Sequence, residues 1–157
     1  MCQHKKFMQE AIGLSEKGMQ SNEGGPFGAI VVKGNQIVGW GNNKVTSSND
    51  PTAHAEVVAI RDACERLGTF QLDDCEIYTS CEPCPMCLGA IYWARPKKVY
   101  YANTKKDAAK IGFDDDFIYQ EINLPLENRQ IPFEQISQEE AWKVFKAWSE
   151  KSDKIDY

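Results

Sequence analysis

One histidine, one glutamate and two cysteines stand at spacings that suit a metal centre. His54 and Glu56 are two residues apart, and Cys84 and Cys87 lie in the stretch Pro-Cys-Pro-Met-Cys. Zinc binds imidazole nitrogen and cysteine sulfur, and a catalytic zinc keeps three protein ligands and one water. His54, Cys84 and Cys87 would supply these three ligands. Glu56 would then stand close enough to move protons for the bound water.

This donor set predicts a hydrolytic reaction. Zinc lowers the pKa of its bound water to near neutrality and so provides a hydroxide nucleophile. Glu56 would accept the proton of the water and deliver protons to the substrate and to its leaving group. A second interpretation of Glu56 is purely structural, because a carboxylate in the first turn of a helix is stabilised by the helix dipole.

The two cysteines alone leave three interpretations open. A Cys-Pro-x-Cys stretch at a helix start resembles a thioredoxin-like redox pair. Cys81 could also join His54, Cys84 and Cys87 in a closed structural zinc site, as in a non-enzymatic zinc-stabilised module. A redox pair does not need His54, and a structural site does not need Glu56. The combination therefore favours catalytic zinc, and it predicts that Cys81 points away from the metal.

Hydrophobic periodicity predicts the elements that position these residues. A helix over 54–67, which Gly68 ends, carries His54 and Glu56 in its first turn. The next predicted helix has Pro83 at its first position and runs through Cys84 to about Ala94. The other predicted elements are a helix over 4–20, strands over 27–33, 36–41, 75–80, 97–102 and 131–136, short helices over 107–110 and 117–121, and a final helix over 139–148.

The order of these elements predicts a single α/β domain over residues 1–157. Gly34-Asn35 predicts an antiparallel hairpin, whereas the succession of strand, helix and strand over 75–102 implies a parallel crossover. We therefore expect a three-layer α/β/α fold with a central mixed sheet of five strands. The chain of 157 residues is long enough to bury a substantial core.

Composition excludes several functional classes. The formal net charge of −5 and the isoelectric point of about 5.1 disfavour nucleic-acid binding, which needs clustered Lys and Arg. No apolar run approaches the roughly 18 residues of a membrane span, and the N-terminus lacks the apolar core of a signal peptide. The six cysteines are expected to be reduced thiols or metal ligands rather than a disulfide framework. We expect a cytoplasmic protein that does not bind membranes.

Several segments resemble the cytidine deaminase superfamily, whose zinc signature is His-x-Glu followed by Pro-Cys-x-x-Cys. Within it, the longer context resembles the bacterial guanine deaminases. The fold expected from this resemblance is cytidine deaminase-like. The resembling segments are GGPFGAIVV at 24–32, TSSNDPTAHAE at 46–56, LDDCEIYTSCEPCPMCLGAIYWARP at 72–96 and GFDDDFIYQEI at 112–122.

The resemblance implies zinc-dependent hydrolysis of free guanine to xanthine and ammonia, with one zinc ion per chain. It implies substrate contacts by Phe27, which would stack on the purine or else pack in the core, and by the amide of Asn43, which is otherwise a turn residue. It further implies contacts by the Ala55 backbone N–H, by Asp115 and by the terminal Tyr157. The alternative is a tRNA adenosine deaminase, which would carry basic residues to hold an RNA stem.

Two further expectations concern the C-terminal part and the assembly. The resemblance implies that residues 138–157, a helix and tail, cover the active site. It also implies a homodimer. The aromatic residues near the second zinc-binding helix and the strand after it would line a subunit interface or else pack in the core; they are Tyr92, Trp93, Tyr100 and Tyr101.

Overall fold

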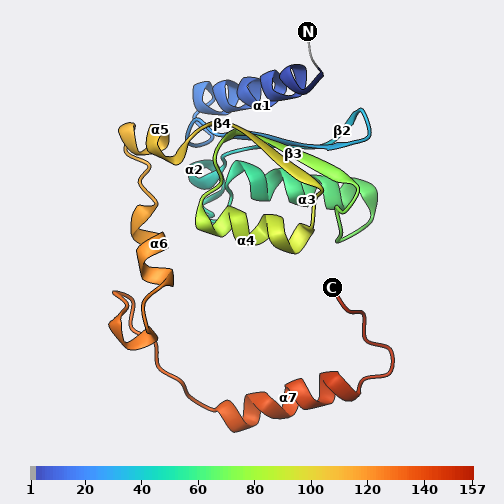
Figure 1. Cartoon of the computed structure of the whole chain (residues 1–157), viewed down its shortest axis with the longest axis vertical. Helices are drawn as coiled ribbons and strands as arrows, with labels where there is room; N and C mark the ends of the chain where they lie inside the picture. Colours follow the sequence, from blue (N-terminus) through green and yellow to red (C-terminus); the bar gives the residue numbers. More distant parts are fainter. Residues whose placement is uncertain (1–2) are drawn as a thin grey trace. The chain divides into compact units, whose positions relative to one another are not determined.

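The computed structural model describes residues 3–157, which divide into two compact units at Asp115/Asp116 (Figure 1). The elements of the first unit are α1 (Gln3–Gln20), β1 (Gly28–Lys33), β2 (Gln36–Asn42), α2 (Val45–Ser48), α3 (Ala55–Leu67), β3 (Cys75–Cys81), α4 (Pro85–Ala94), β4 (Lys98–Asn103) and α5 (Lys105–Lys110). Those of the second are α6 (Asp116–Ile122), the 3₁₀ turn η1 (Leu126–Asn128) and α7 (Gln138–Glu150).

The sheet of the first unit is mixed and has the strand order β2-β1-β3-β4. β1 pairs antiparallel with both β2 and β3, and β3 pairs parallel with β4, so the predicted hairpin and the parallel crossover are confirmed. Gly34, with φ of 60°, takes the left-handed conformation that the hairpin turn requires. Helix α1 covers one face of the sheet, and α3 and α4 cover the other (Figure 1). The α/β/α layering of the first unit agrees with the prediction.

The predicted fifth strand is wrong. Within residues 3–157 the sheet has four strands, and the segment 131–136 is irregular. Pro132 removes one backbone donor from this segment. Its apolar side chains, those of Ile131, Phe133 and Ile136, are 71%, 56% and 76% exposed. The segment therefore has the composition of a strand but lacks the buried face that would stabilise one.

Two smaller differences concern helix starts. Helix α4 begins at Pro85 with Cys84 as its N-cap, so Pro83 lies outside the helix that it was predicted to open. Residues 44–53, for which the sequence predicts no helix or strand, contain the single turn α2. One helical turn is too short to show an amphipathic pattern, and the sequence therefore gives no sign of it. The other predicted elements are confirmed to within about two residues, the usual uncertainty of helix and strand ends.

Small residues allow α3 to lie close to the sheet. Ala55, Ala59 and Ala63 recur every four residues along α3, and all three are fully buried. They face Gly39 and Gly41 of β2. An added Cβ at Gly41 would overlap the carbonyl oxygen of Ala55, and one at Gly39 would come within 2.5 Å of the carbonyl oxygen of Ala59. Glycine is therefore required at both positions, and the N-terminal end of α3 is held against the sheet.

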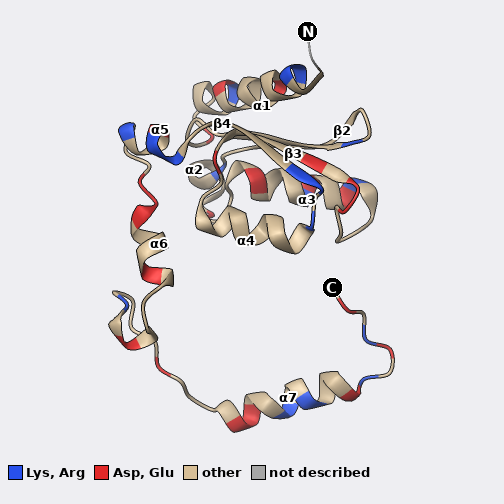
Figure 2. Ribbon diagram, in the orientation of Figure 1, with Lys and Arg blue, Asp and Glu red and all other residues tan. Residues whose placement is uncertain are grey.

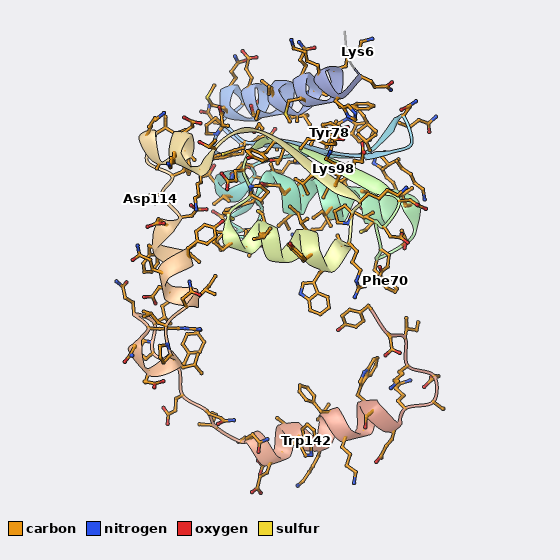
Figure 3. All side chains as sticks on the ribbon, viewed as in Figure 1. Lys6, Phe70, Tyr78, Lys98, Asp114 and Trp142 are labelled. Carbon is orange, nitrogen blue, oxygen red and sulfur yellow. The ribbon has the colours of Figure 1, made fainter. Side chains whose placement is uncertain are left out.

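The opposite face of the sheet packs around Tyr78, which is fully buried between α1 and the sheet (Figure 3). Its hydroxyl donates a hydrogen bond of 2.9 Å to Glu76 Oε2 and lies 2.6 Å from His4 Nδ1. Because a hydroxyl carries one hydrogen, His4 Nδ1 must be the donor of the second bond. The ring of Tyr78 also stacks on that of Tyr100, with centroids 4.6 Å apart and planes inclined by 10°.

Tyr100 therefore belongs to the packed interior, whereas other aromatic side chains of the first unit face outward. Tyr92, Trp93 and Tyr101 are 76%, 64% and 53% exposed. The described chain has no helix with the length and apolar character that a membrane span requires.

Candidate active site

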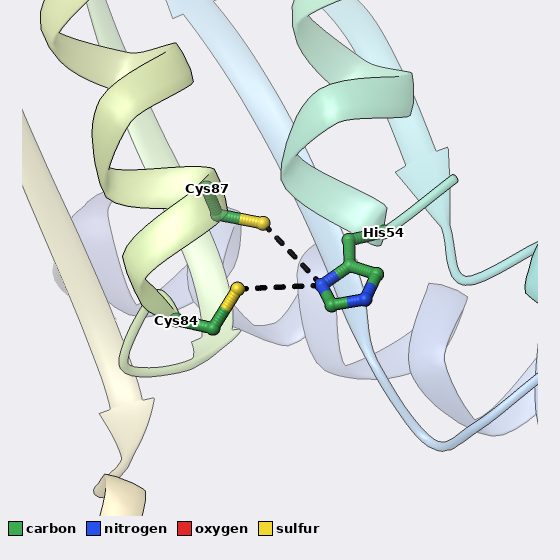
Figure 4. A group of neighbouring side chains, drawn as sticks. All are labelled: His54, Cys84 and Cys87. Carbon is green, nitrogen blue, oxygen red and sulfur yellow. Dashed lines mark hydrogen bonds between the residues drawn. The ribbon is translucent and has the colours of Figure 1, made fainter. Parts of the chain in front are cut away.

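Two helix starts bring three potential metal ligands together (Figure 4). His54 is the N-cap of α3, Cys84 is the N-cap of α4, and Cys87 lies in the first turn of α4. Both capping residues have extended backbones, which turn their side chains out of the helix that follows. Among residues 3–157, these three form the one group of His, Cys, Asp or Glu whose ligand atoms could jointly hold a metal ion.

The spacing of the three side chains fits zinc. The Sγ atoms of Cys84 and Cys87 each lie 3.5 Å from His54 Nδ1. In a tetrahedral site with Zn–S of about 2.3 Å and Zn–N of about 2.0 Å, a sulfur and a nitrogen ligand lie roughly 3.5 Å apart. All three ligand atoms fall within 4.8 Å of one another. The side chains therefore need little rearrangement to accept the ion through His54 Nδ1 and two thiolates.

The electrostatics of the cluster already favour a thiolate. A hydrogen bond from the Cys87 thiol, together with one from His54, lowers the pKa of Cys84 to about 4. The same bond raises the pKa of Cys87, which keeps its proton in this arrangement. Interaction with the Cys84 sulfur also raises the pKa of His54. Thiolate is the form of cysteine that binds metals.

Glu56 is buried beside this cluster. Its side chain lies in the first turn of α3, and the residue is 6% exposed. Burial raises the pKa of its carboxyl group, since the charged form loses its solvation. Cys87 Sγ lies 3.4 Å from Glu56 Oε2, and the hydroxyl of Thr79 lies 3.3 Å from Oε1. The carboxyl group thus adjoins the cluster and has an environment suited to accepting and returning a proton.

The thiol of Cys81 is directed elsewhere. Cys81 Sγ donates to the carbonyl oxygen of Thr104 at 3.7 Å, and Cys81 is absent from the metal-binding group. Burial raises the pKa of this thiol to about 11, so it stays protonated at neutral pH. This arrangement agrees with the expectation that Cys81 points away and leaves a fourth position for water.

Asn43 is a buried polar residue with its side chain fixed. Its Oδ1 accepts hydrogen bonds from the backbone N–H groups of Gly25 at 3.3 Å and Val45 at 3.1 Å. In the part of the chain that the structure describes, its amide nitrogen has no hydrogen-bond partner. Asn43 therefore stabilises its own turn through the oxygen, and the two N–H groups of its amide nitrogen are not used within the described chain.

Phe27 has the core contact that was one of its two predicted roles, and its stacking on a purine stays a prediction. It is half-buried and packs against the core cluster of the α3 and α4 face. Its ring also meets that of Phe113 edge to face, with centroids 4.9 Å apart. The sequence analysis did not single out Phe113, although it directly precedes the acidic loop. Ala55 is fully buried at the first helical position of α3, where a backbone N–H has no partner inside the helix.

The three aspartates of the acidic loop differ in exposure. Asp115 is half-buried, whereas Asp114 and Asp116 are exposed. Loss of solvation, and secondarily the negative charge of Cys84, raises the pKa of Asp115. Asp115 is therefore the least exposed of the three, and its contact with a substrate stays a prediction. Tyr157 belongs to the second unit, and its contribution to the site stays a prediction.

Thr79 is the residue near the site that the sequence analysis missed. It is 1% exposed, and it lies on the central strand β3 with its hydroxyl against Glu56. One sequence feature could have revealed it. Ile77, Thr79 and Cys81 alternate along a strand whose side chains are almost all buried, and Thr79 places a hydroxyl on that buried face.

Comparisons with known proteins agree with this geometry. Residues 1–103 match the family model described as the cytidine and deoxycytidylate deaminase zinc-binding region. The chain is 57% identical to the guanine deaminase of Bacillus subtilis over 98% of its own length and 99% of that protein. The crystal structure of guanine deaminase from Bacillus subtilis superposes with a TM-score of 0.95, covering 98% of each chain.

Other relatives are more distant. The tRNA-specific adenosine deaminase of Aquifex aeolicus is 34% identical over 92% of this chain and 93% of that protein. A variant protein that was crystallised in complex with 8-azaguanine is 33% identical. The match covers 71% of this chain and 65% of that protein, with a TM-score of 0.69. The zinc-site motif, the geometry of the site and these matches together show that the chain belongs to the zinc-binding cytidine and deoxycytidylate deaminase family.

Proposed function

We propose that this protein is a zinc-dependent guanine deaminase, which converts guanine and water to xanthine and ammonia. The observation that carries the proposal is the 57% identity with a guanine deaminase over almost the whole of both chains. The buried Glu56 beside the His54, Cys84 and Cys87 cluster supports the same reaction. A redox pair would not need His54, and a structural zinc site would not need Glu56.

The proposed roles of the residues are as follows. Zinc held by His54, Cys84 and Cys87 would supply an activated water molecule as the nucleophile for C2 of guanine. Glu56 accepts the proton of that water, and it then delivers protons to the ring nitrogen and to the departing amine. The bond between C2 and the exocyclic amine then breaks, and ammonia leaves. The new C2–O bond is retained in xanthine. Burial of Glu56 suits this task, because a raised pKa brings the carboxyl group closer to the pH at which it must both take and give protons.

Five residues are proposed to bind the purine. Asn43 offers the two N–H donors of its amide nitrogen, and the Ala55 backbone N–H offers a third at the start of α3. Asp115 would accept hydrogen bonds from the N–H groups of guanine. Phe27, placed by Phe113, would contact the flat face of the ring. Tyr157 would approach the substrate from the terminal segment.

Charge favours a small nucleobase over an RNA stem. The formal net charge is −5. Lys and Arg share α1 and α7 with Asp and Glu, and the three lysines of α5 stand beside Asp107 (Figure 2). A phosphate backbone is held by clustered positive charge. We therefore propose that the substrate is the free base and that nucleic acid is not bound.

We further propose that the whole chain acts as one deaminase domain in which residues 138–157 cover the active site. Helix α7 carries the exposed aromatic side chains of Trp142, Phe145 and Trp148, which are 58%, 69% and 44% exposed and therefore available for packing. A covering segment would exclude water and larger substrates. Deletion of residues 152–157 should then lower guanine turnover without changing zinc content. Unchanged kinetics of the shortened protein would count against this role.

A cytoplasmic homodimer completes the proposal. Exposed aromatic side chains of the first unit, Tyr92, Trp93 and Tyr101, would suit a subunit interface. The cysteines are proposed to be reduced thiols or metal ligands, as in a reducing compartment. Sedimentation equilibrium of the purified protein would give twice the chain mass if the dimer exists, and a single-chain mass would contradict it.

A substrate screen tests the proposed function. Purified zinc-loaded protein would be assayed for ammonia release from guanine, adenine, cytosine, their nucleosides and a tRNA that carries adenosine at the anticodon. Guanine should be turned over far faster than the others, with xanthine as the product. Turnover confined to another aminated ring would retain the mechanism but contradict the substrate, and activity on the tRNA alone would favour the adenosine deaminase alternative.

A further inference from the structure

The Thr79 hydroxyl joins the candidate proton carrier to the backbone of the central strand. Its Oγ1 lies 3.3 Å from Glu56 Oε1 and 3.0 Å from the carbonyl oxygen of Cys81. All three residues are buried, so water does not readily replace either contact. A buried carboxyl oxygen that loses its partner bears a desolvation cost. Thr79 therefore has a physical reason to fix where the carboxyl group of Glu56 stands.

The other side-chain contact of Glu56 depends on the state of the metal ligands. Cys87 Sγ can donate to Glu56 Oε2, at 3.4 Å, only while it is a thiol. A cysteine that serves as a zinc ligand is a thiolate and has no hydrogen to donate. The Thr79 hydroxyl keeps its hydrogen in the zinc-loaded protein. It is therefore the partner that can hold Glu56 in the active form.

The chemistry of a hydroxyl suits this role. A hydroxyl has one donor hydrogen and two acceptor positions, and its hydrogen can rotate. Thr79 can donate to Glu56, or it can donate to the Cys81 carbonyl and accept from Glu56. A valine of the same shape could do neither.

The position of Thr79 in the sheet makes it a rigid support. β3 is bordered by β1 on one side and β4 on the other, and Thr79 pairs with Ala29 and with Tyr101. The branched side chain has a restricted χ1 angle, and the residue is 1% exposed. Glu56, in contrast, is carried by the first turn of α3 on a longer side chain.

We propose that Thr79 is a positioning residue for the deamination reaction and that it holds the Glu56 carboxyl group in place through its hydroxyl. The inference rests on the proposed function, because it assigns Thr79 an effect on turnover only through Glu56. It predicts a loss in kcat with little change in KM, since Glu56 serves the chemical steps and not the binding of the ring.

The test compares Thr79→Val with Thr79→Ser in full-length, zinc-loaded protein. Thr79→Val should lower kcat about 10- to 100-fold, a part of the 10²- to 10⁴-fold that acid–base catalysis contributes, with KM and zinc content preserved. Thr79→Ser keeps the hydroxyl and should recover most of the lost kcat. Ser80→Ala is the matched control, because the buried Ser80 hydroxyl accepts from the Gly28 N–H at 3.0 Å rather than contacting Glu56. It should keep the wild-type kcat per bound zinc.

A double-mutant cycle sharpens the test. In a Glu56→Gln background, Thr79→Val should cause a much smaller further loss of kcat than it does in the wild type, because the two residues act as one unit. A full additional loss in that background would overturn the inference. So would an unchanged kcat in Thr79→Val, a change confined to KM, or a loss of zinc that accounts for the loss of activity.

The outcomes separate this inference from the proposed function. Wild-type protein that is inactive on guanine would refute the proposed substrate, and the Thr79 comparison would then use the ring that the screen identifies. Wild-type protein that is active on guanine, with an equally active Thr79→Val variant, would refute the role of Thr79 alone. If Thr79→Val does not fold, Thr79→Ala against Thr79→Ser makes the same comparison, with the fold checked by circular dichroism.

Discussion

Tyr78 and Thr79 are neighbours on β3, but their hydroxyls lie on opposite faces of the sheet and have different surroundings. The Tyr78 hydroxyl bonds to His4 and Glu76, and its ring stacks on Tyr100. The Thr79 hydroxyl contacts Glu56, which adjoins the three potential zinc ligands. The first network attaches α1 to the sheet. The second belongs to a site where ionisable groups converge.

This difference shows how buried polar groups can be sorted into structural and chemical ones. Both hydroxyls are satisfied, so burial and hydrogen bonding alone do not distinguish them. What distinguishes them is the next residue in each chain of contacts. Substitutions on the Tyr78 side should change stability, and substitutions on the Thr79 side should change turnover.

The largest expected effect concerns the zinc ligands. Cys84→Ser should lose zinc and all measurable deaminase activity, because one thiolate ligand is removed. Cys81→Ser is the matched control, since its thiol faces the Thr104 carbonyl. It should retain one zinc per chain as measured by inductively coupled plasma mass spectrometry. Zinc loss in both variants to the same extent would place Cys81 among the ligands.

The next effect separates metal binding from chemistry. Glu56→Gln should keep zinc but lower kcat by about 10²- to 10⁴-fold, because the amide cannot carry the proton. Zinc content and single-turnover kinetics would be measured on the same preparation. Near-normal turnover in the zinc-loaded variant would show that Glu56 is only a helix-start carboxylate.

A third prediction tests the close contact between α1 and the sheet. An added Cβ at Gly28 would overlap the carbonyl oxygen of Ala11 and come within 2.5 Å of the Ser15 nitrogen. Gly28→Ala should therefore lower the free energy of unfolding by about 1–3 kcal/mol. Gly13→Ala, in α1 with nothing near its added Cβ, should raise it by about 0.5–1 kcal/mol. Urea denaturation that gave both variants the same sign would contradict this packing.

The smallest expected effect lies on the Tyr78 side. Tyr78→Phe removes a hydroxyl with two hydrogen bonds, and it should lower the free energy of unfolding by about 1–2 kcal/mol. Its kcat per bound zinc should equal that of the wild type. A fall in kcat comparable with that of Thr79→Val would break the proposed distinction between the two faces of β3.

The sequence predicted the metal group well because its information is local. His54 and Glu56 share one helix start, and Cys84 and Cys87 share another, so spacing and helix-end chemistry were enough to propose that they converge. The four strands of the sheet were predicted for a similar reason, since each is a short run with β-branched or aromatic residues, which favour strands.

The features that the sequence did not predict depend on contacts between distant segments. The run 131–136 has strand-like residues, but a strand also needs a neighbour and a buried face. The importance of Thr79 follows from the approach of β3 to α3, 23 residues away along the chain at Glu56. Likewise, Tyr100 and Tyr101 look alike in sequence, and their opposite directions on β4 decide that Tyr100 stacks on Tyr78 while Tyr101 is exposed.

Zinc K-edge X-ray absorption of the purified protein tests the central claim most directly, because it counts the atoms that bind the metal. The account predicts one zinc with two sulfur ligands at about 2.3 Å and two nitrogen or oxygen ligands at about 2.0 Å, which are the His54 imidazole and a water. The Glu56→Gln variant should give the same spectrum. A shell of three sulfurs, which would add Cys81 and close the site to water, would contradict the account.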